Sequence, residues 1–580
     1  MKNASPWVAL GVTAKYLSGV NRCKIGGLLQ VEGHPNKKAS MVTRIPAPSG
    51  RIKNGKTVAQ DMASQAAIKV QKNLKRAVAG TLGLSGERMS KVDTAWLRMD
   101  CDANLMMIVG VWQLQPGVKY EAVCERIENS LLKYDRFKQR VMEDAAGATW
   151  VKDRNFDLAH HVVRDKLPKA AKATKATKAT NGAGSNQQPA LQDRVAELAT
   201  QRLDPKRPLW QIHLIEDYTG PDGVQGSAMI VRIHHCIADG IALISVTMSL
   251  VDGGAPPPER RKKDAAATSA EDWIAQTLLK PFTDLTVRAL DAVGEGASRS
   301  LGMLEEPKKG LADGLEKGLH GSVDMAKVLL QVLKDGAALA LMPDDSKTRL
   351  KGKPGGVKKV AWCEPIALEE VKAVGKALNC SINDVLLSCV AGALGEYLKS
   401  QGDDVTGQEI RAMVPVNLRP LDQAYKLGNR FGLVPLVLPI GIENPVERVY
   451  EVRRRMATLK GSYQPLLAFS LLAVAGLLIK PAQDALLSLF AKKTTAVMTN
   501  VPGPREKLQF CGSTLEQSMF WVPQSGNVGL GVSILSYGGG VQFGVITDSL
   551  LCPQPQHIID EFVPEFAKLS IVTLMLPWSD

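Results

Sequence analysis

The stretch SAMIVRIHHCIADGIALISVTMSLVD, residues 227–252, changes its hydrophobic period halfway along its length. Its first part, Met229 to Ile233, is a short apolar run of the kind that forms a buried strand. From Gly240 onward the apolar residues recur at helical spacings of three and four: Ile241, Ile244, Met248 and Val251. The stretch therefore predicts a strand ending in two histidines and a helix starting just after them. In α/β folds this is a usual place for residues that face a ligand.

The motif between the two elements, HHCIADG (His234 to Gly240), contains residue types suited to proton transfer. A neutral imidazole at this place could accept a proton from an alcohol, because its unperturbed pKa of ~6.5 suits a general base near neutral pH. Asp239 is expected to fix the loop through a salt bridge or hydrogen bonds. Gly240 suits the abrupt turn because glycine lacks a Cβ.

A second pair of histidines, in HHVVRDK (His160 to Lys166), tests this interpretation, since the two pairs hold half of the eight histidines. The second pair shows no change of period: a lysine stands in place of the glycine, and Pro168 follows. We interpret His160 and His161 as structural residues at a strand or loop edge, one of them buried and hydrogen-bonded. For the HHCIADG pair, the structural alternative is a satisfied core histidine beside a helix start.

Composition and charge limit the function classes. With 45% hydrophobic and 22% charged residues, the 580-residue chain can bury a sizeable core. Of its formal net charge of +14, residues 1–89 hold +12 (15 Lys/Arg, 3 Asp/Glu), which leaves +2 for the rest. Such a basic, aromatic-poor extension suits solubility or anionic lipid surfaces, and we expect no nucleic-acid partner. Nine cysteines without CxxC spacing or a Cys/His cluster argue against disulfides and a metal site and for a reducing compartment.

Two apolar stretches bear on membrane targeting. The N-terminal WVALGV is too short for a secretory signal, so export is not expected. The longest apolar stretch, PLLAFSLLAVAGLLIK (Pro465 to Lys480), is shorter than the ~20 residues that a spanning helix needs. A buried core helix and an interfacial segment lying on a membrane both stay open for it.

Low-complexity and Pro/Gly-rich stretches divide the chain into four parts. These are a poorly ordered basic extension (1–88), a first block with HHCIADG and a low-complexity insertion at 169–190 (89–252), a helical connection (253–358) and a second block (359–580). Both blocks mix helical and strand patterns, which favours α/β layers. In the second block, GLGVSILSYGGGVQFGVITD (Gly529 to Asp548) predicts a β-hairpin with a glycine turn.

HHCIADG resembles the HHxxxDG signature of the CoA-dependent acyltransferase superfamily, and further segments match in order. They are RPLW (Arg207–Trp210), SINDVLLSCVAGAL (Ser381–Leu394), MVPVNLRP (Met413–Pro420), LGNRFG (Leu427–Gly432) and TNVPGP (Thr499–Pro504). Together, over about residues 89–575, they resemble the bacterial wax ester synthase/diacylglycerol acyltransferase family. The DFGWG element of some superfamily branches has no counterpart here. The extension and the insertion are not part of the usual family core.

The resemblance implies an α/β fold of two chloramphenicol-acetyltransferase-like domains with mixed sheets, a helical connection between them and an active-site tunnel at their junction. It implies direct acyl transfer from acyl-CoA to diacylglycerol or a long-chain fatty alcohol, with no covalent intermediate and no cofactor. His235 is then the general base, with His234, Asp239 and Gly240 in support. The HHVVRDK pair is similar to a family segment whose histidine is not the base.

The companion motifs supply candidate substrate-binding residues, each with a simpler structural alternative. Asn383 and Asp384 precede an apolar helix, so a capping role and a place beside the active site are both open. Thr499 and Asn500 precede a Pro/Gly turn that does not itself require them, and a position facing the cleft is expected. Trp210 is a candidate too, although packing between elements is the simpler interpretation.

Two lipid substrates suit an enzyme that rests on the inner face of the cytoplasmic membrane or on lipid inclusions. The basic extension and Pro465–Lys480 are the candidate contacts. A homodimer is left open. Two other functions also stay open: a condensation-type acyltransferase with a carrier-bound donor, and a non-catalytic lipid-surface protein.

Overall fold

The computed structural model describes residues 86–144, 147–167, 186–254, 341–419, 426–460, 464–475, 483, 488 and 491–575. These residues belong to one unit of the chain, 79–580. Almost all of the predicted extension, and most of the predicted insertion and helical connection, lie outside the described residues.

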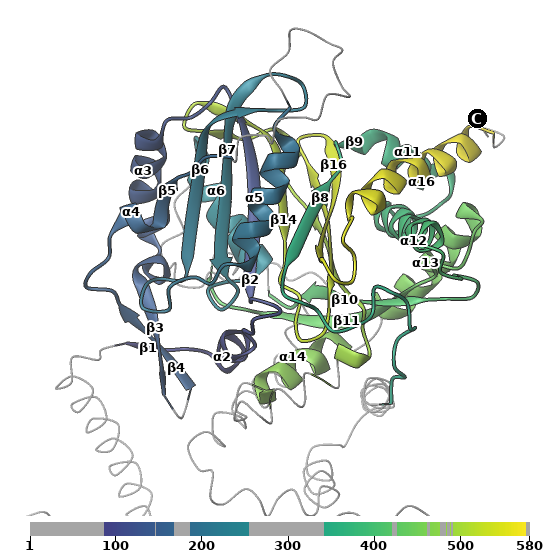
Figure 1. Cartoon of the computed structure of the whole chain (residues 1–580), viewed down its shortest axis with the longest axis horizontal. Helices are drawn as coiled ribbons and strands as arrows, with labels where there is room; N and C mark the ends of the chain where they lie inside the picture. The colour runs from purple at the N-terminus through teal and green to yellow at the C-terminus, as the bar shows by residue number, and fades with distance from the viewer. Residues whose placement is uncertain are drawn as a thin grey trace, which may run out of the picture. The chain divides into compact units, whose positions relative to one another are not determined.

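The first sheet combines strands from both sequence blocks (Figure 1). Within the described residues its order is β13-β14-β2-β7-β6-β5, in which β5 and β6 are parallel and the other neighbours are antiparallel. The strands are β2 (Met107–Gln115), β5 (Val162–Arg164), β6 (Trp210–Thr219), β7 (Gln225–His234), β13 (Gln509–Phe510) and β14 (Ser513–Trp521). The boundary predicted near residue 359 therefore does not separate the two sheets, because β13 and β14 of the second block belong to the first sheet.

Helices and a small sheet accompany the first sheet. The helices are α2 (Lys91–Arg98), α3 (Tyr120–Asn129), α4 (Leu158–His161), α5 (Gln188–Thr200) and α6 (Gly240–Leu250), with short 3-10 turns at Leu131–Lys133 and Asp135–Lys138. The small sheet has the order β1-β4-β3, from β1 (Glu87–Arg88), β3 (Gln139–Asp144) and β4 (Gly147–Lys152).

The second sheet has the order β11-β10-β12-β15-β16-β8, and β9 pairs with β16. It is mixed, because β12 runs parallel to both β10 and β15 while the other pairs are antiparallel. Its strands are β8 (Lys358–Trp362), β9 (Ile366–Ala367), β10 (Ile410–Asn417), β11 (Phe431–Leu438), β12 (Ala496–Pro502), β15 (Leu530–Tyr537) and β16 (Gly540–Asp548). The predicted α/β fold with mixed sheets is confirmed.

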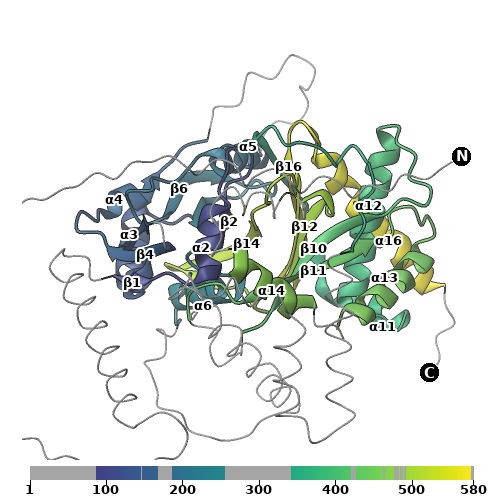
Figure 2. The same ribbon diagram turned by 90° about the horizontal axis from the view of Figure 1, so that it is seen from below.

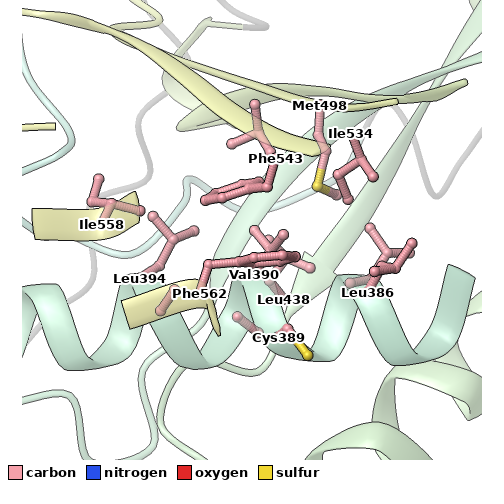
Figure 3. Packing of buried hydrophobic residues seen from close by; sticks show 14 of the residues in the cluster. Leu386, Cys389, Val390, Leu394, Leu438, Met498, Ile534, Phe543, Ile558 and Phe562 are labelled. Carbon is pink, nitrogen blue, oxygen red and sulfur yellow. The ribbon is translucent and has the colours of Figure 1, made fainter. Parts of the chain in front are cut away.

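The described residues of the second block form five helices. They are α11 (Leu368–Ala377), α12 (Ile382–Ser400), α13 (Pro445–Lys460), α14 (Gln464–Ala475) and α16 (Gln556–Leu574). The central helix α12 is buried along most of its length and packs against the second sheet and α16. In Figure 3, Phe543 of β16 lies over Phe562 of α16, and their ring centroids are 4.3 Å apart. This core holds the second sheet in place. Strand β11 of that sheet begins at the candidate site described below.

The two sheets also share a hydrophobic cluster. Val109 and Val111 of β2 belong to the same buried cluster as Trp362 of β8 and Trp521 of β14. The rings of the two tryptophans lie 5.6 Å apart. The first and second sheets are therefore packed together through a common apolar core.

Two local predictions are confirmed. Residues 227–252 form β7 and α6, and Gly529–Asp548 forms the hairpin of β15 and β16. Gly538 and Gly539 make the turn with φ of 56° and 83°, in a region that glycine adopts at little cost.

The apolar stretch that begins at Pro465 forms α14, whose residues Leu472 and Ala475 are buried. This helix packs against β11 and lies beside α2 in both views (Figures 1 and 2). The contacts favour the core-helix interpretation for Gln464–Ala475, while residues 476–480 lie outside the described part.

Among the described residues, no single helix is long and apolar enough to cross a membrane. By length and composition, α11 and α12 would pass only as a pair, and that pair is bent by 98°.

Candidate active site

The HHCIADG loop lies against the LGNRFG loop of the second block. The backbone N–H of Gly428 donates to the carbonyl of Ile237 (3.0 Å), and Ala238 forms a parallel bridge with Gly428. Gly428 has a φ of 102°, a conformation open to glycine at little cost. Since LGNRFG leads directly into β11, the motif is held between an element of the first sheet and one of the second.

Asp239 ties the two loops together. It is the N-cap of α6, where Oδ1 accepts from the N–H of Ala242 (3.0 Å). Its Oδ2 accepts from Nη2 of Arg419 (2.7 Å) and from the N–H of Arg430 (2.8 Å). The side chains of Asp239 and Arg419 are both only 4% exposed, so this is a buried ion pair. Asp239 therefore has the loop-fixing contacts expected from the sequence.

The imidazole of His235 lies in an aromatic enclosure. Its ring stacks on Trp96 of α2, with centroids 4.3 Å apart and planes 16° apart, and Phe431 lies 5.5 Å away. His235 is 4% exposed, and its N–H donates to the carbonyl of Met106 (2.7 Å). The stacking fixes the plane of the ring, and the backbone bond anchors its position.

Burial lowers the pKa of His235 to about 4, because a charged imidazolium loses hydration there. Its own backbone carbonyl, the Asp239 carboxylate and the Asn429 side chain act in the opposite direction and raise it less. The ring is consequently neutral at pH 7, with a nitrogen lone pair ready to accept a proton.

His234 has a different environment although it is the neighbouring residue. Its Nδ1 accepts from the N–H of Cys236 (3.2 Å), and its Nε2 faces Oδ1 of Asp100 at 3.8 Å. An accepting Nδ1 implies that the proton is on Nε2, toward the carboxylate. Burial would raise the pKa of Asp100, but the His234 contact, the Met106 N–H and Arg202 together lower it. Both nitrogens of His234 are thus occupied, which makes His235 the better candidate base.

Gly240 corrects one detail of the sequence interpretation. It is the first residue of α6, it has no positive φ, and a Cβ built there meets no heavy atom within 4 Å. The turn therefore does not require glycine. The missing side chain instead leaves open space beside the motif.

The HHVVRDK pair has the structural environment predicted for it. His161 is fully buried; its Nδ1 lies 2.8 Å from the carbonyl of Trp210, and its ring stacks between Phe156 and Trp210. Burial lowers the pKa of His161 to about 4. His160 and His161 end α4, immediately before the edge strand β5.

Trp210 lies in a buried hydrophobic cluster together with other residues of the first sheet. It is 1% exposed, its Nε1 donates to the carbonyl of Phe137 (2.9 Å), and its ring packs on Phe137 and His161. These contacts are those of a packing residue, and they favour the simpler of the two interpretations of RPLW.

Three of the other candidate residues, Asn383, Asp384 and Asn500, meet at the start of α12. Asp384 forms a capping box with Ser381, which accounts for its position as a helix cap. Asn383 accepts a hydrogen bond from Nδ2 of Asn500 (2.9 Å), and the buried Thr499 pairs with Ser533 on β15. SINDV and TNVPGP are therefore joined side chain to side chain, while their role as substrate contacts stays a prediction, as does the tunnel.

Sequence reasoning did not single out several residues that hold the HHCIADG loop. Trp96 and Asn429 contact His235, Arg419 pairs with Asp239, and Asp93 binds Asn429. Two of the motifs contain Arg419 and Asn429, since Arg419 lies in MVPVNLRP and Asn429 in LGNRFG. Asp93 and Trp96 lie in α2, outside every quoted motif. Their distance from HHCIADG along the chain concealed the contact. Among the described residues, no group of three or more His, Cys, Asp or Glu side chains could hold a metal ion.

Comparisons with known proteins identify the family of the chain. The wax ester synthase/diacylglycerol acyltransferase catalytic domain matches residues 89–386, and the C-terminal domain of the same family matches 427–570. A probable diacylglycerol O-acyltransferase of Mycobacterium tuberculosis is 27% identical over 79% of this chain and 90% of its own length. The O-acyltransferase WSD of Acinetobacter baylyi is 24% identical over 72% of this chain and 82% of its own.

A solved structure supports the fold. The wax ester synthase/diacylglycerol acyltransferase from Marinobacter aquaeolei VT8 superposes with a TM-score of 0.54 at 20% identity, covering 84% of this chain and 99% of that one. The two family domains together contain the histidine motif and, apart from β10, the strands of the first and second sheets. The chain belongs to the wax ester synthase/diacylglycerol acyltransferase family.

Proposed function

We propose that this acyltransferase moves a fatty acyl group from acyl-CoA to the hydroxyl of a lipid alcohol, with His235 as the general base. Family membership supports the reaction class. The observation that carries the assignment to a residue is the neutral, buried imidazole of His235, held between the two motif loops. The acceptor is diacylglycerol, a long-chain fatty alcohol or both, as the names of a curated relative and of the similar solved structure suggest.

The proposed step is a direct transfer. His235 removes the hydroxyl proton as the alcohol oxygen attacks the thioester carbonyl, and a tetrahedral oxyanion forms beside the new imidazolium. The oxyanion then collapses and the carbon–sulfur bond breaks, which releases the ester and the CoA thiolate. The imidazolium of His235 gives its proton to that sulfur, so that CoA leaves as the thiol and the neutral ring is restored. Acyl-CoA is a substrate in this scheme, and no cofactor takes part.

A base with a pKa of about 4 is always available at pH 7 but provides little driving force for proton transfer. The oxyanion offsets this deficit, because its negative charge forms next to the imidazolium in a site of low dielectric constant. The enclosure by Trp96 and Phe431 keeps that dielectric low.

The decisive experiment uses purified protein with palmitoyl-CoA and either hexadecanol or dioleoylglycerol. Thiol release and neutral lipid formation are both measured. General-base catalysis contributes roughly 10²–10⁴-fold, so His235→Ala should lower kcat by that factor with a similar thermal unfolding midpoint. His161→Gln is a matched control, since it alters another buried histidine of depressed pKa and should leave kcat nearly unchanged.

Each other outcome has a clear meaning. Near-full activity in His235→Ala would remove the base assignment. Absence of turnover with both acceptors, together with turnover from a carrier-bound acyl donor, would favour a condensation-type enzyme. Lipid binding without turnover of any donor would favour a non-catalytic lipid-surface protein.

We further propose that the protein works at the inner membrane face or on lipid inclusions, and its lipid substrates support this. The net charge of +12 in residues 1–89 suits an anionic surface. Flotation with phosphatidylglycerol vesicles should show binding that falls with added salt, and Lys72→Glu with Lys75→Glu should weaken it. Equal flotation with neutral and anionic vesicles would argue against charge-driven attachment. The homodimer stays a prediction that light scattering can test.

A further inference from the structure

The side chain of Asn429 has a defined orientation. Its Nδ2 lies 2.8 Å from Oδ1 of Asp93 and 2.7 Å from the backbone oxygen of His235. A carbonyl oxygen only accepts, and so does an ionised carboxylate, so the atom between them must be the NH₂ group with both hydrogens donated. The amide oxygen of Asn429 therefore points elsewhere, and it is buried without a partner among the described residues.

Asp93 fixes the position of Asn429 through hydrogen bonds. Its Oδ1 also accepts from the backbone N–H of Asn429 (2.9 Å), so the carboxylate binds this one residue twice. Burial raises the pKa of Asp93, while the bonds from Asn429 and Ser90 oppose that effect. A Cβ on Gly428 would lie 3.3 Å from Oδ2 of Asp93, and that glycine's φ of 102° turns the chain toward the carboxylate. The backbone and the carboxylate together determine where the Asn429 amide points.

The ring of His235, like the Asn429 amide, has one buried polar atom without a partner among the described residues. Its Nδ1 is buried and, within the described part of the chain, makes no hydrogen bond of normal geometry. Asn429 and the ring's own backbone carbonyl both raise the pKa of His235, as acceptors facing a ring N–H do. The Asn429 amide thus binds the backbone of His235 through Nδ2. This bond leaves its oxygen and Nδ1 of the same histidine as two buried atoms without a partner among the described residues.

We propose that Asn429, oriented by Asp93, is a positioning residue that keeps Nδ1 of His235 protonated, so that Nε2 presents its lone pair to the alcohol. The inference rests on the proposed role of His235 as base. It assigns a function to the LGNRFG loop and to α2, which come from different blocks and touch no substrate in this scheme. The fixed tautomer matters because a ring with its proton on Nε2 cannot accept the hydroxyl proton at that atom.

Kinetics provides the first test. In Asn429→Ala we expect kcat to fall roughly 10- to 100-fold, the usual effect of losing a partner that orients a functional histidine. The KM values for acyl-CoA and alcohol should change by less than about twofold, since Asn429 binds neither. Asp93→Asn keeps the volume and an accepting oxygen but loses the charge, so a smaller fall of roughly 3- to 10-fold is expected.

Asn104→Ala is the matched control. Asn104 is also buried, and its Nδ2 also donates to two backbone carbonyls, those of Gly526 (2.7 Å) and Val528 (3.1 Å), but it does not contact His235. Its variant should lose comparable stability and keep kcat. If Asn429→Ala shows no cooperative unfolding transition, Asp93→Asn decides alone, and an unchanged kcat in it would overturn the proposal.

A spectroscopic test is independent of turnover. With ¹⁵N-labelled histidine, two-bond ¹H–¹⁵N correlations distinguish a protonated Nδ1 from a protonated Nε2, and loss of a signal in His235→Ala assigns the ring. Wild type should show His235 with its proton on Nδ1, and Asn429→Ala should show a mixture or the other tautomer. An inactive His235→Ala combined with normal kcat and tautomer in Asn429→Ala would refute this inference alone. An active His235→Ala would refute the proposed function instead.

Discussion

At the scale of single residues, the two histidines of HHCIADG differ because β7 ends at His234. Alternation along the chain turns neighbouring side chains to opposite sides, so His234 faces Asp100 while His235 enters the Trp96 enclosure. The His234 ring gains a carboxylate partner, whereas the His235 ring is shielded from water by aromatic side chains. The chemistry of each follows from that environment, since the side chains themselves are identical.

The aromatic enclosure should set the pH dependence of turnover. Because only the neutral ring accepts a proton and burial lowers the pKa of His235 to about 4, the acid limb of kcat/KM should lie well below pH 6.5. Trp96→Ala admits water, so the pKa should rise toward its ordinary value and the limb should move to higher pH. Rate profiles between pH 4.5 and 8 measure this. An acid limb near pH 6.5 in the wild type would contradict the assigned environment.

Buried histidines should also make stability depend on pH. Burial lowers the pKa values of His161 and His213 to about 4, as it does for His235, whereas the unfolded chain titrates near ~6.5. Between these values the unfolded state binds more protons. The free energy of unfolding should then fall as pH falls, by about 1.4 kcal/mol per pH unit for each such histidine.

Urea unfolding at pH 5 to 7 tests that dependence, in a window above the titration of most carboxyl groups. His161→Gln removes one titrating group, so the slope of stability against pH should decrease by about one proton. An unchanged slope would show that His161 does not lose its proton on folding.

At the scale of elements, the buried pair of Asp239 and Arg419 joins the start of α6 to the end of β10. Removing one partner leaves an uncompensated buried charge, so Asp239→Asn and Arg419→Met should each destabilise by about 3–5 kcal/mol. The double variant should lose less than the sum, because no charge is then left unpaired. Unfolding free energies in a double-mutant cycle measure the coupling.

The half-exposed pair of Arg349 and Asp403 provides a control for this cycle, with an expected coupling of about 0–1 kcal/mol. Additive effects at Asp239 and Arg419 would show that the two loops are held by their backbone contacts instead.

The sequence predicts those elements whose signals are local. The switch from β7 to α6 and the hairpin of β15 and β16 follow from period and turn residues within about twenty positions. The contact of Asn429 with Asp93 and His235 has no such signal, because it depends on how two sheets pack. Nor does the sequence show that Gly240 is sterically unconstrained, since a glycine in a turn and one beside open space look the same.

At the scale of the whole described unit, the two sheets depend on each other. β14 belongs to the second block yet pairs with β2 along its length, and Lys358 of β8 donates to Oδ1 of Asn104 in the first (2.5 Å). Val109, Trp362 and Trp521 share one buried cluster. The first sheet lacks its β13–β14 edge without the second block, and the buried cluster between the two sheets needs residues of both blocks.

We therefore expect the two sheets to unfold in one cooperative transition. Tryptophan fluorescence reports on both sheets, because Trp210 lies in the first sheet and Trp362 lies in the second. Trp150, in the small sheet, adds a signal from the first block. Transitions followed by fluorescence and by far-ultraviolet circular dichroism should coincide in urea. Two separated transitions would show that each sheet can stay folded after the other has unfolded.

The strand exchange also affects synthesis on the ribosome. β2 ends at residue 115 and β14 begins at 513, so 397 residues (116–512) must be made before β2 gains its second partner. At ~5–20 residues per second this delay lasts roughly 20–80 s. Throughout it, the strand beside the histidine motif has an unpaired edge that can join another nascent chain. A gene that is split or shortened after the catalytic domain at residue 386 would make this exposure permanent, and its product should aggregate unless the missing strand is supplied in trans.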